Sequence, residues 1–276
     1  MTNHRILQLL AACLTTLALS GTAKAEDLVI PGSGNPEYVL GQLAAAFNAQ
    51  QTRHRVTVPP SSGTAGALRD VESGATALGR VGRALKDEER ARGLVYLPLG
   101  RDPVTFVTGA AGTVRNITSA QAEGVFRGTV TDWSALGGKP GPIRAIGRET
   151  TDAARQAIGR HIKSFDSLVF GDEVKLVHLD PQAIELLDRY ATSLGFLNRS
   201  GLAAAKTRLV MLALDGVEPT PQNLEAGKYP LWLEFGLVHK SGSLGGAAQA
   251  FVEFVRGPAG QQLLRTHGIL PAPTGR

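Results

Sequence analysis

Cysteine is almost absent from this chain, because Cys13 is the only one among 276 residues. It lies in a 25-residue opening segment in which His4 and Arg5 precede the apolar run ILQLLAACLTTLAL and small residues end at Ala25. This pattern is typical of a cleaved secretory signal peptide. We therefore expect a periplasmic protein whose mature chain has no disulfide bond and is held together by its core. The alternative is a lipoprotein, because LAAC at 10–13 resembles a lipoprotein processing box.

Aromatic residues are also scarce, and the excess of positive charge is small. Aromatics make up 5% of the chain, and the net charge of +5 comes without any run of lysine or arginine. Nucleic-acid binding usually needs a basic patch or stacking aromatics, so we expect no nucleic-acid partner. After residue 25 no apolar segment is long enough to span a bilayer, so the mature protein is not expected to cross the membrane.

Recognisable catalytic and metal-binding motifs are missing as well. The six histidines are scattered without ligand spacing, and no Ser/His/Asp, Cys/His or paired-acid arrangement is visible. We therefore predict a binding protein rather than an enzyme, with no metal and no cofactor.

What the chain does contain is a regular alternation of strand and helix patterns. Apolar runs predict strands, and apolar residues at helical spacing predict the helices between them. The alternation predicts an α/β fold with a largely parallel sheet. The expected strands are 27–32, 55–60, 94–100, 103–109, 143–147, 174–179, 194–198, 208–214 and 231–240, and the expected helices are 38–50, 67–74, 86–93, 120–126, 151–163, 181–191 and 247–268, the last broken at 257–258.

Three strand-to-helix loops carry small or hydroxyl residues just before a helix. They are 32–35 (GSGN), 61–64 (SSGT) and 148–152 (RETTD). The first turn of a helix offers unpaired backbone N–H groups and a positive dipole end, and glycine lets a ligand approach the backbone. One such loop alone is usually a plain helix cap, but three that converge would form an anion site.

These loops lie within a longer run of motifs. SSGTAGALRDVESGATALGRVGRALKDEE (61–89), NITSAQAEGVFRGTVTDWSALGGKPGPIRAIGRE (116–149), LGFLN (194–198) and DGVEPTPQNLEAGKYPLW (215–232) follow one another in order. In this order and spacing the chain resembles the periplasmic phosphate-binding proteins of ABC importers, which have the type II periplasmic binding protein fold.

The resemblance implies two α/β lobes with a ligand cleft between them that closes by hinge motion. The first lobe would comprise 26–103 and 231–276, and the second 104–230. It further implies a monomer that captures phosphate and delivers it to the permease of an ABC importer. In this family the arginine of the GRE motif binds the oxyanion, and that role falls on Arg148. The ligand residues implied are Ser33, Gly34, Asn35, Ser62, Gly63, Thr64, Arg83, Arg148, Asp152, Ala153, Ala154 and Arg155.

The chain departs from the family pattern at the third loop. Asp152, Ala153 and Ala154 stand where the family has Ser-Gly-Thr, so both hydroxyl groups are missing. Gly82 stands where some phosphate receptors place an acid that accepts the proton of the phosphate. Asp152 could take over that role, or it could only stabilise the first turn of its helix. Arg80 is expected near the cleft or on the surface.

These departures leave the ligand open. Alternatives to phosphate are sulfate, molybdate, tungstate, a small carboxylate or a phosphoester. A sensory or adhesive extracellular protein of the same fold is the alternative from a different functional class.

Overall fold

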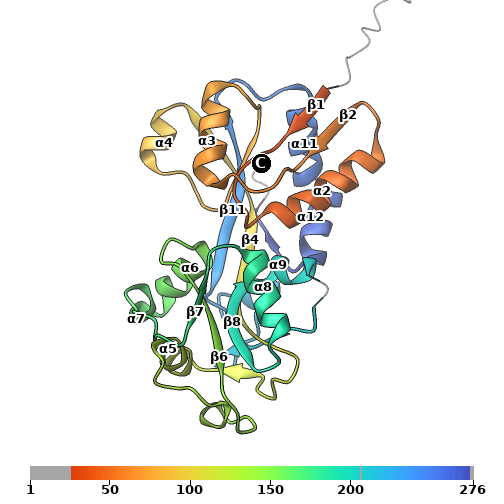
Figure 1. Ribbon diagram of the computed structural model, residues 1–276. Helices are drawn as coiled ribbons and strands as arrows, with labels where there is room; N and C mark the ends of the chain where they lie inside the picture. Colours follow the sequence, from red (N-terminus) through yellow and green to blue (C-terminus); the bar gives the residue numbers. More distant parts are fainter. Residues whose placement is uncertain (1–25, 206, 274–276) are drawn as a thin grey trace, which may run out of the picture.

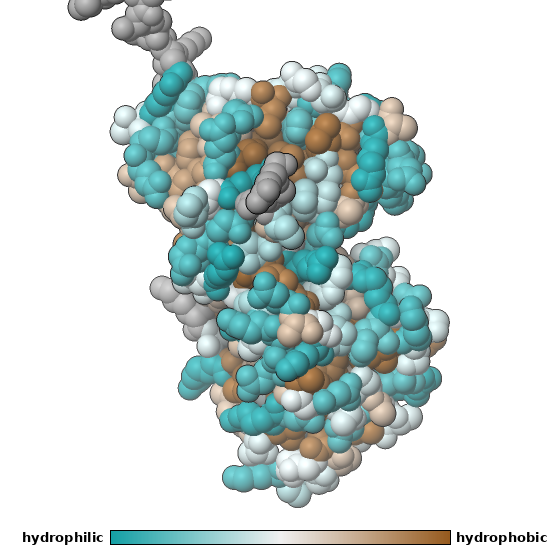
Figure 2. Space-filling model, turned by 180° about the vertical axis from the view of Figure 1, so that it is seen from behind, coloured by the Kyte–Doolittle hydropathy of each residue, from teal (hydrophilic) through white to brown (hydrophobic). Residues whose placement is uncertain are grey.

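The computed structural model describes residues 26–273 except residue 206, so the predicted signal peptide and the lipoprotein alternative lie outside the described residues. The chain forms two lobes joined end to end (Figure 1). The long strands β4 (Leu94–Thr108) and β11 (Trp232–Lys240) run from one lobe into the other. In the space-filling view the molecule narrows between the lobes (Figure 2).

The first lobe combines an N-terminal segment with the C-terminal helices. Strands β1 and β2 pair in parallel, and helix α11 packs against both of them. Two segments that are far apart in sequence therefore share one core. The elements of this lobe are β1 (Glu26–Val29), α2 (Glu37–Gln50), β2 (His54–Thr57), α3 (Gly63–Ser73), β3 (Gly79–Val81), α4 (Asp87–Ala91), α11 (Gly246–Arg256), α12 (Pro258–Thr266) and β12 (Leu270–Pro271).

The second lobe is formed by the chain between the two crossing strands. Its elements are β5 (Asn116–Ile117), α5 (Ser119–Arg127), the 3-10 helix η1 (Trp133–Leu136), β6 (Arg144–Arg148), α6 (Ala153–His161), α7 (Lys163–Asp166), β7 (Lys175–Val177), α8 (Asp180–Arg189), β8 (Ser193–Asn198), α9 (Arg199–Ala204), β9 (Val210–Met211), β10 (Ala213–Leu214) and α10 (Pro221–Glu225).

The main sheet is mixed, which corrects the prediction of a largely parallel sheet. Its strand order is β3-β11-β4-β8-β6-β7, and the pairs from β3 to β8 are antiparallel while β8-β6 and β6-β7 are parallel. The chain crosses to the second lobe on β4 and returns on β11, so these neighbours must run in opposite directions. The two strands predicted at 94–100 and 103–109 are one strand, with a register shift opposite Phe235 and Gly236.

Each lobe has its own apolar core. In the second lobe four phenylalanine rings, Phe106, Phe126, Phe165 and Phe196, lie with centroids 5.3–6.5 Å apart and are almost completely buried. In the first lobe, Phe47 packs edge-on against rings of α11. The scarce aromatics are therefore concentrated in the cores. The lobe boundaries drawn from the sequence stay a prediction.

Two helix starts in the second lobe follow from local sequence. Thr118 caps α5 as predicted, with its hydroxyl accepting from the Gln121 N–H at 3.1 Å. Helix α6 begins at Ala153 rather than at residue 151, because Asp152 is its N-cap. The sequence interpretation missed several short elements, among them β3, α9 and α10. Within residues 26–273 no helix is both long and apolar enough to cross a membrane.

Candidate functional site

The first of the three loops is held in place by Arg80. This side chain is completely buried, which corrects the expectation of a surface position. Its guanidinium donates to the Ser33 carbonyl at 2.7 Å and the Pro59 carbonyl at 2.8 Å, and it also binds Glu37 at 3.1 Å. Gly32 has φ +139°, and a Cβ there would lie 2.0 Å from the Arg80 carbonyl oxygen. Arg80 is therefore committed to the loop backbone rather than to a ligand.

The second loop is hydrogen-bonded to the first through its backbone. The N–H groups of Ser62 and Gly63 both donate to the Gly32 carbonyl, at 3.0 and 3.1 Å. Ser61 adds a hydroxyl bond to the same carbonyl at 3.1 Å. Two of the residues expected to bind the ligand thus fix the geometry of the two loops. Thr64, in the first turn of α3, remains directed toward the space between the lobes.

That space contains a cavity of about 320 Å³, here called the small cavity. Residues of both lobes line it, and five of them were expected from the sequence. Thr64 and Ala153, at the starts of α3 and α6, both line it, so the positive dipole ends of two helices lie close to this cavity. Its lining consists of Ser33, Asn35, Thr64, Gly82 and Arg83 from the first lobe, Thr151, Ala153, Gln156 and Arg160 from the second, and Leu233 and Glu234 from β11.

Two arginines supply positive charge to the small cavity. Arg83 is about two-fifths exposed and donates to both carboxylate oxygens of Glu89, at 2.7 and 2.8 Å. This pairing lowers the pKa of Glu89 to about 2. Arg160, on α6, donates to the Trp232 carbonyl at 2.8 Å, and burial lowers its pKa. No carboxylate of the described residues forms an ion pair with Arg160.

Gly82, also in the small cavity, has little room for a side chain. A Cβ at this position would lie 2.7 Å from the Ser33 hydroxyl oxygen and 3.2 Å from the Asn35 side-chain nitrogen. The acid that some phosphate receptors place here would therefore displace the side chains of Ser33 and Asn35. Its absence matches the close packing of the loops.

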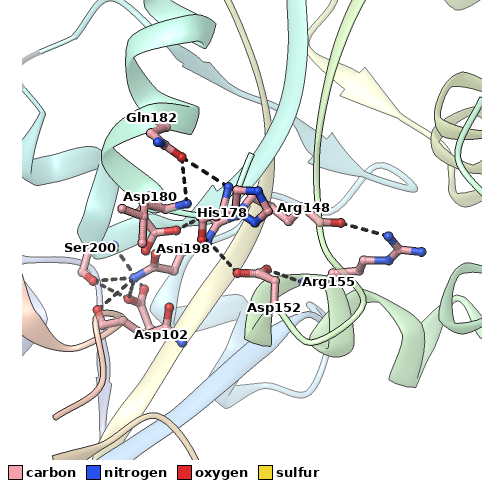
Figure 3. Close-up of polar contacts among 11 residues, drawn as sticks. Asp102, Arg148, Asp152, Arg155, His178, Asp180, Gln182, Asn198 and Ser200 are labelled. Atoms are coloured by element: carbon pink, nitrogen blue, oxygen red, sulfur yellow. Dashed lines mark hydrogen bonds and ion pairs between the residues drawn. The ribbon is translucent and has the colours of Figure 1, made fainter. Parts of the chain in front are cut away.

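In the third loop the Arg148 side chain lies between two carboxylates (Figure 3). The guanidinium contacts Asp180 through Nη1, and through Nη2 it contacts Asp152 at 2.8 Å and the His178 carbonyl at 3.1 Å. Its side chain is 6% exposed. Two negative groups therefore surround one positive group, and Arg148 is neutralised by the protein itself.

Asp152 has two partners within its own segment. It accepts the Arg155 backbone N–H at 2.9 Å as the N-cap of α6 and pairs with Arg148. Burial raises the pKa of Asp152, while the Arg148 charge acts in the opposite direction. The capping role proposed as one alternative is present in the structure. Whether this carboxylate also contacts a ligand stays a prediction.

Arg155 points away from the space between the lobes. It donates to the carbonyls of Arg148 at 2.9 Å and Leu168 at 2.6 Å, and it stacks over the Phe170 ring at 3.9 Å. The residue is 5% exposed. It therefore ties the third loop to the core of the second lobe.

A second cavity, of about 630 Å³, adjoins the first and is here called the large cavity. It shares Ser33 and Asn35 with the small cavity. Arg148 and Asp180 reach it from the second lobe, and Tyr38 and Pro60 from the first. At its base Asn198 donates to Asp102 at 2.7 Å, and Asp102 also accepts from Ser200. Burial raises the pKa of Asp102 to about 6.

The twelve predicted ligand residues thus fall into three groups. Ser33, Asn35, Thr64, Arg83 and Ala153 meet in the small cavity, while Gly34 and Arg148 line the large one. The other five do not line either of these two cavities; they are Ser62, Gly63, Asp152, Ala154 and Arg155.

Sequence reasoning missed several residues of the cleft. Asp180 begins α8 directly after β7, so it carries the same strand-to-helix signal as the three loops that were singled out. Arg160 and Gln156 lie on α6 beyond its first residues, where no local motif marks them. Asn198 ends a strand that was predicted, but its place at the junction of the lobes depends on the tertiary fold.

The arrangement suits recognition of a small anion. Hydroxyl groups, helix starts and two arginines line the small cavity together with one carboxylate, Glu234, so its arginines outnumber its acids. Charge-assisted hydrogen bonds from arginine to an anion are strong. Among the described residues no group of three or more His, Cys, Asp or Glu could hold a metal ion.

Comparisons with known proteins identify the family and the fold. Residues 19–258 match the family model of the PBP superfamily domain. The phosphate-binding protein PstS of Bacillus subtilis (strain 168) is 24% identical over 268 residues, which covers 91% of this chain and 84% of the relative. A Clostridium perfringens protein solved with bound phosphate is 22% identical with a TM-score of 0.77, over 90% of this chain and 100% of that one.

A third similarity is to an ABC-type phosphate transport receptor from Vibrio cholerae, which is 20% identical with a TM-score of 0.65, over 90% of this chain and 100% of that one. At these identities the structural similarities establish the fold. They confirm the predicted two-lobed α/β architecture.

Proposed function

The chain belongs to the family of the PBP superfamily domain, and on that premise we propose that it captures phosphate between its two lobes and delivers it to an ABC importer. The mature protein acts by binding and release, with hinge motion of the lobes around β4 and β11 enclosing the ligand.

The observation that carries the proposal is the composition of the small cavity. The start of α3 reaches it from one lobe and the start of α6 from the other, through Thr64 and Ala153. Two helix N-termini aimed at one space favour an anion. Arg83 and Arg160 add formal charge from opposite lobes, so an anion between them would draw the lobes together. The names of the relatives favour phosphate among the oxyanions.

Isothermal titration calorimetry tests the proposal. Orthophosphate titrated into the purified mature chain should bind at one site per molecule. Thr64→Val removes one hydroxyl while keeping the side-chain shape, and we expect affinity to fall by about tenfold, the equivalent of one hydrogen bond. Thr129→Val is the matched control, because Thr129 is exposed and its hydroxyl bonds the Gly124 carbonyl within the second lobe.

Two results would overturn the assignment. Folded protein that gives no heat with phosphate refutes the ligand. Equal losses of affinity in Thr64→Val and Thr129→Val refute the location.

Export is part of the same proposal and has its own test. N-terminal sequencing of the protein from the periplasmic fraction should find Glu26 as the first residue, because cleavage is expected after Ala25. A lipid-modified Cys13 at the N-terminus would instead support the lipoprotein alternative and show that the predicted cleavage position is wrong.

A further inference from the structure

The large cavity is too spacious to be explained by orthophosphate alone. Its volume of about 630 Å³ is roughly twice the 320 Å³ of the small cavity, and the two meet at Ser33 and Asn35. Cavities of about 300–1,000 Å³ usually enclose organic ligands. Orthophosphate has five heavy atoms, so it would occupy only a part of the joined space.

Apolar side chains from both lobes line the large cavity. Leu179 and Ile184 come from the second lobe, and Tyr38 and Pro60 come from the first. Leu179 is 57% exposed, and none of the other large exposed apolar side chains of the described residues lines this cavity. Sites for organic ligands are usually lined by apolar and aromatic side chains with a few polar groups. This wall therefore favours a ligand that carries carbon atoms.

The charges of the large cavity argue against a second anionic group. Arg148 is held by Asp152 and Asp180 together, so the three side chains carry one net negative charge when both carboxylates are ionised. Asp180 is 25% exposed and lines the cavity, as does the Asn198 amide. A carboxylate accepts a hydrogen bond from a hydroxyl group without giving up its arginine partner. Hydroxyl groups therefore suit this cavity better than a second phosphate.

The shared residues of the two cavities give a substituent on the phosphate a way out of the small cavity. A phosphate monoester has three terminal oxygens, and its fourth oxygen carries the substituent. Because both cavities are lined by Ser33 and Asn35, a substituent on a phosphate in the small cavity would enter the large cavity at these residues.

We propose that the physiological ligand is a phosphate monoester of a short polyol, with its phosphate in the small cavity and its hydroxylated carbon chain in the large cavity. The inference rests on the proposed function, because it places the phosphate group where orthophosphate was assigned.

Titration calorimetry with orthophosphate and with glycerol 3-phosphate tests the proposal. The wild-type protein should bind glycerol 3-phosphate about tenfold more tightly, as expected for burial of two or three carbon atoms. Ile184→Trp fills part of the large cavity. It should therefore lower the affinity for glycerol 3-phosphate by about tenfold and change the affinity for orthophosphate by less than about twofold.

A second pair of variants tests the same inference if Ile184→Trp does not fold. Leu179→Ser removes an exposed apolar side chain from the cavity lining. It should lower the affinity for glycerol 3-phosphate about threefold and leave the affinity for orthophosphate unchanged. Leu176→Ser is the matched control, because Leu176 is also an exposed leucine, 46% accessible, but does not line the cavity. It should change neither affinity.

The outcomes separate this inference from the proposed function. If neither ligand binds the wild-type protein, the proposed function fails and the inference fails with it. If orthophosphate binds as tightly as glycerol 3-phosphate, or more tightly, the inference is overturned while the proposed function stands. Equal losses for both ligands in the cavity variants would also overturn it, because the apolar wall would then serve lobe closure.

Discussion

The two lobes present their arginines to the cleft in different ways. On the first lobe Arg83 is 42% exposed and pairs with a single carboxylate, Glu89. On the second lobe Arg148 is 6% exposed and pairs with two, Asp152 and Asp180. Both arginines were expected to bind the ligand, yet only Arg83 has a partially solvated guanidinium that a ligand could share.

The difference shows that an arginine in a loop predicted to bind the ligand can instead be held by carboxylates of the protein itself. If Arg148 left its partners, two poorly solvated carboxylates would remain without a cation, and burial of an unpaired charge is costly. Arg83 also pairs with a buried carboxylate, Glu89, but its own side chain is 42% exposed, so water reaches its guanidinium and a ligand can contact it. The second lobe therefore uses its arginine for rigidity, and the first lobe keeps its arginine available.

The largest expected effect comes from removing Arg148. Arg148→Ala leaves Asp152 and Asp180 without their common partner, and we expect the free energy of unfolding to fall by about 3–5 kcal/mol. Urea unfolding followed by circular dichroism measures it. Arg90→Ala is the control, because Arg90 and its partner Asp87 are exposed on α4; its cost should stay below about 0.5 kcal/mol. A similar small cost for Arg148→Ala would contradict the structural role.

A smaller effect is expected from Asp152→Ser. Serine can still cap α6, but the contact to Arg148 is lost, so we expect a cost of about 1–2 kcal/mol. Because Asp152 is occupied by its partners, the ratio of phosphate to sulfate affinity should change by less than about twofold. Titrations with both anions measure that ratio. A collapse of phosphate selectivity would show that Asp152 faces the ligand and would assign it the proton-accepting role.

The smallest effect is pH-dependent and concerns Glu89. Its pKa is lowered to about 2 by the Arg83 pairing, so it stabilises the fold when ionised. This contribution is fully present above the ordinary value of 4.5 and is lost as the pH falls through about 2. The difference in unfolding midpoint between wild type and Glu89→Gln should therefore shrink as the pH is lowered across this window.

Glu88→Gln is the matched control for that titration, because Glu88 lies on the same helix with an exposed side chain. Its difference from wild type should stay small throughout. A wild-type advantage over Glu89→Gln that grows as the pH falls would contradict the ion-pair account.

Much of the fold could be predicted because its signals are local. Helix caps such as Thr118, apolar periodicity and loop glycines each act over a few residues. The mixed sheet could not be predicted in this way, because the pairing of β4 with β11 depends on how the chain returns from the second lobe. Strand patterns give the elements, whereas strand direction is a property of the tertiary path.

The candidate site shows the same limit at the level of single side chains. The three loops were found from sequence, because small residues before a helix are a local signal. The direction of each arginine was not found. Arg80 and Arg155 lie in or beside two of these loops, but each turns inward to backbone carbonyls. A long flexible side chain bonds to whichever acceptors the fold places within reach, and these lie 7 to 47 positions away in sequence without a motif that marks them.

The central claim is that a phosphate-like anion binds in the small cavity between the lobes. A crystal structure of the mature chain with arsenate, which resembles phosphate and scatters anomalously, tests it most directly. The account predicts one arsenic peak between Thr64, Arg83 and Ala153. A peak beside Arg148 in the large cavity, or no peak between the lobes, would contradict it.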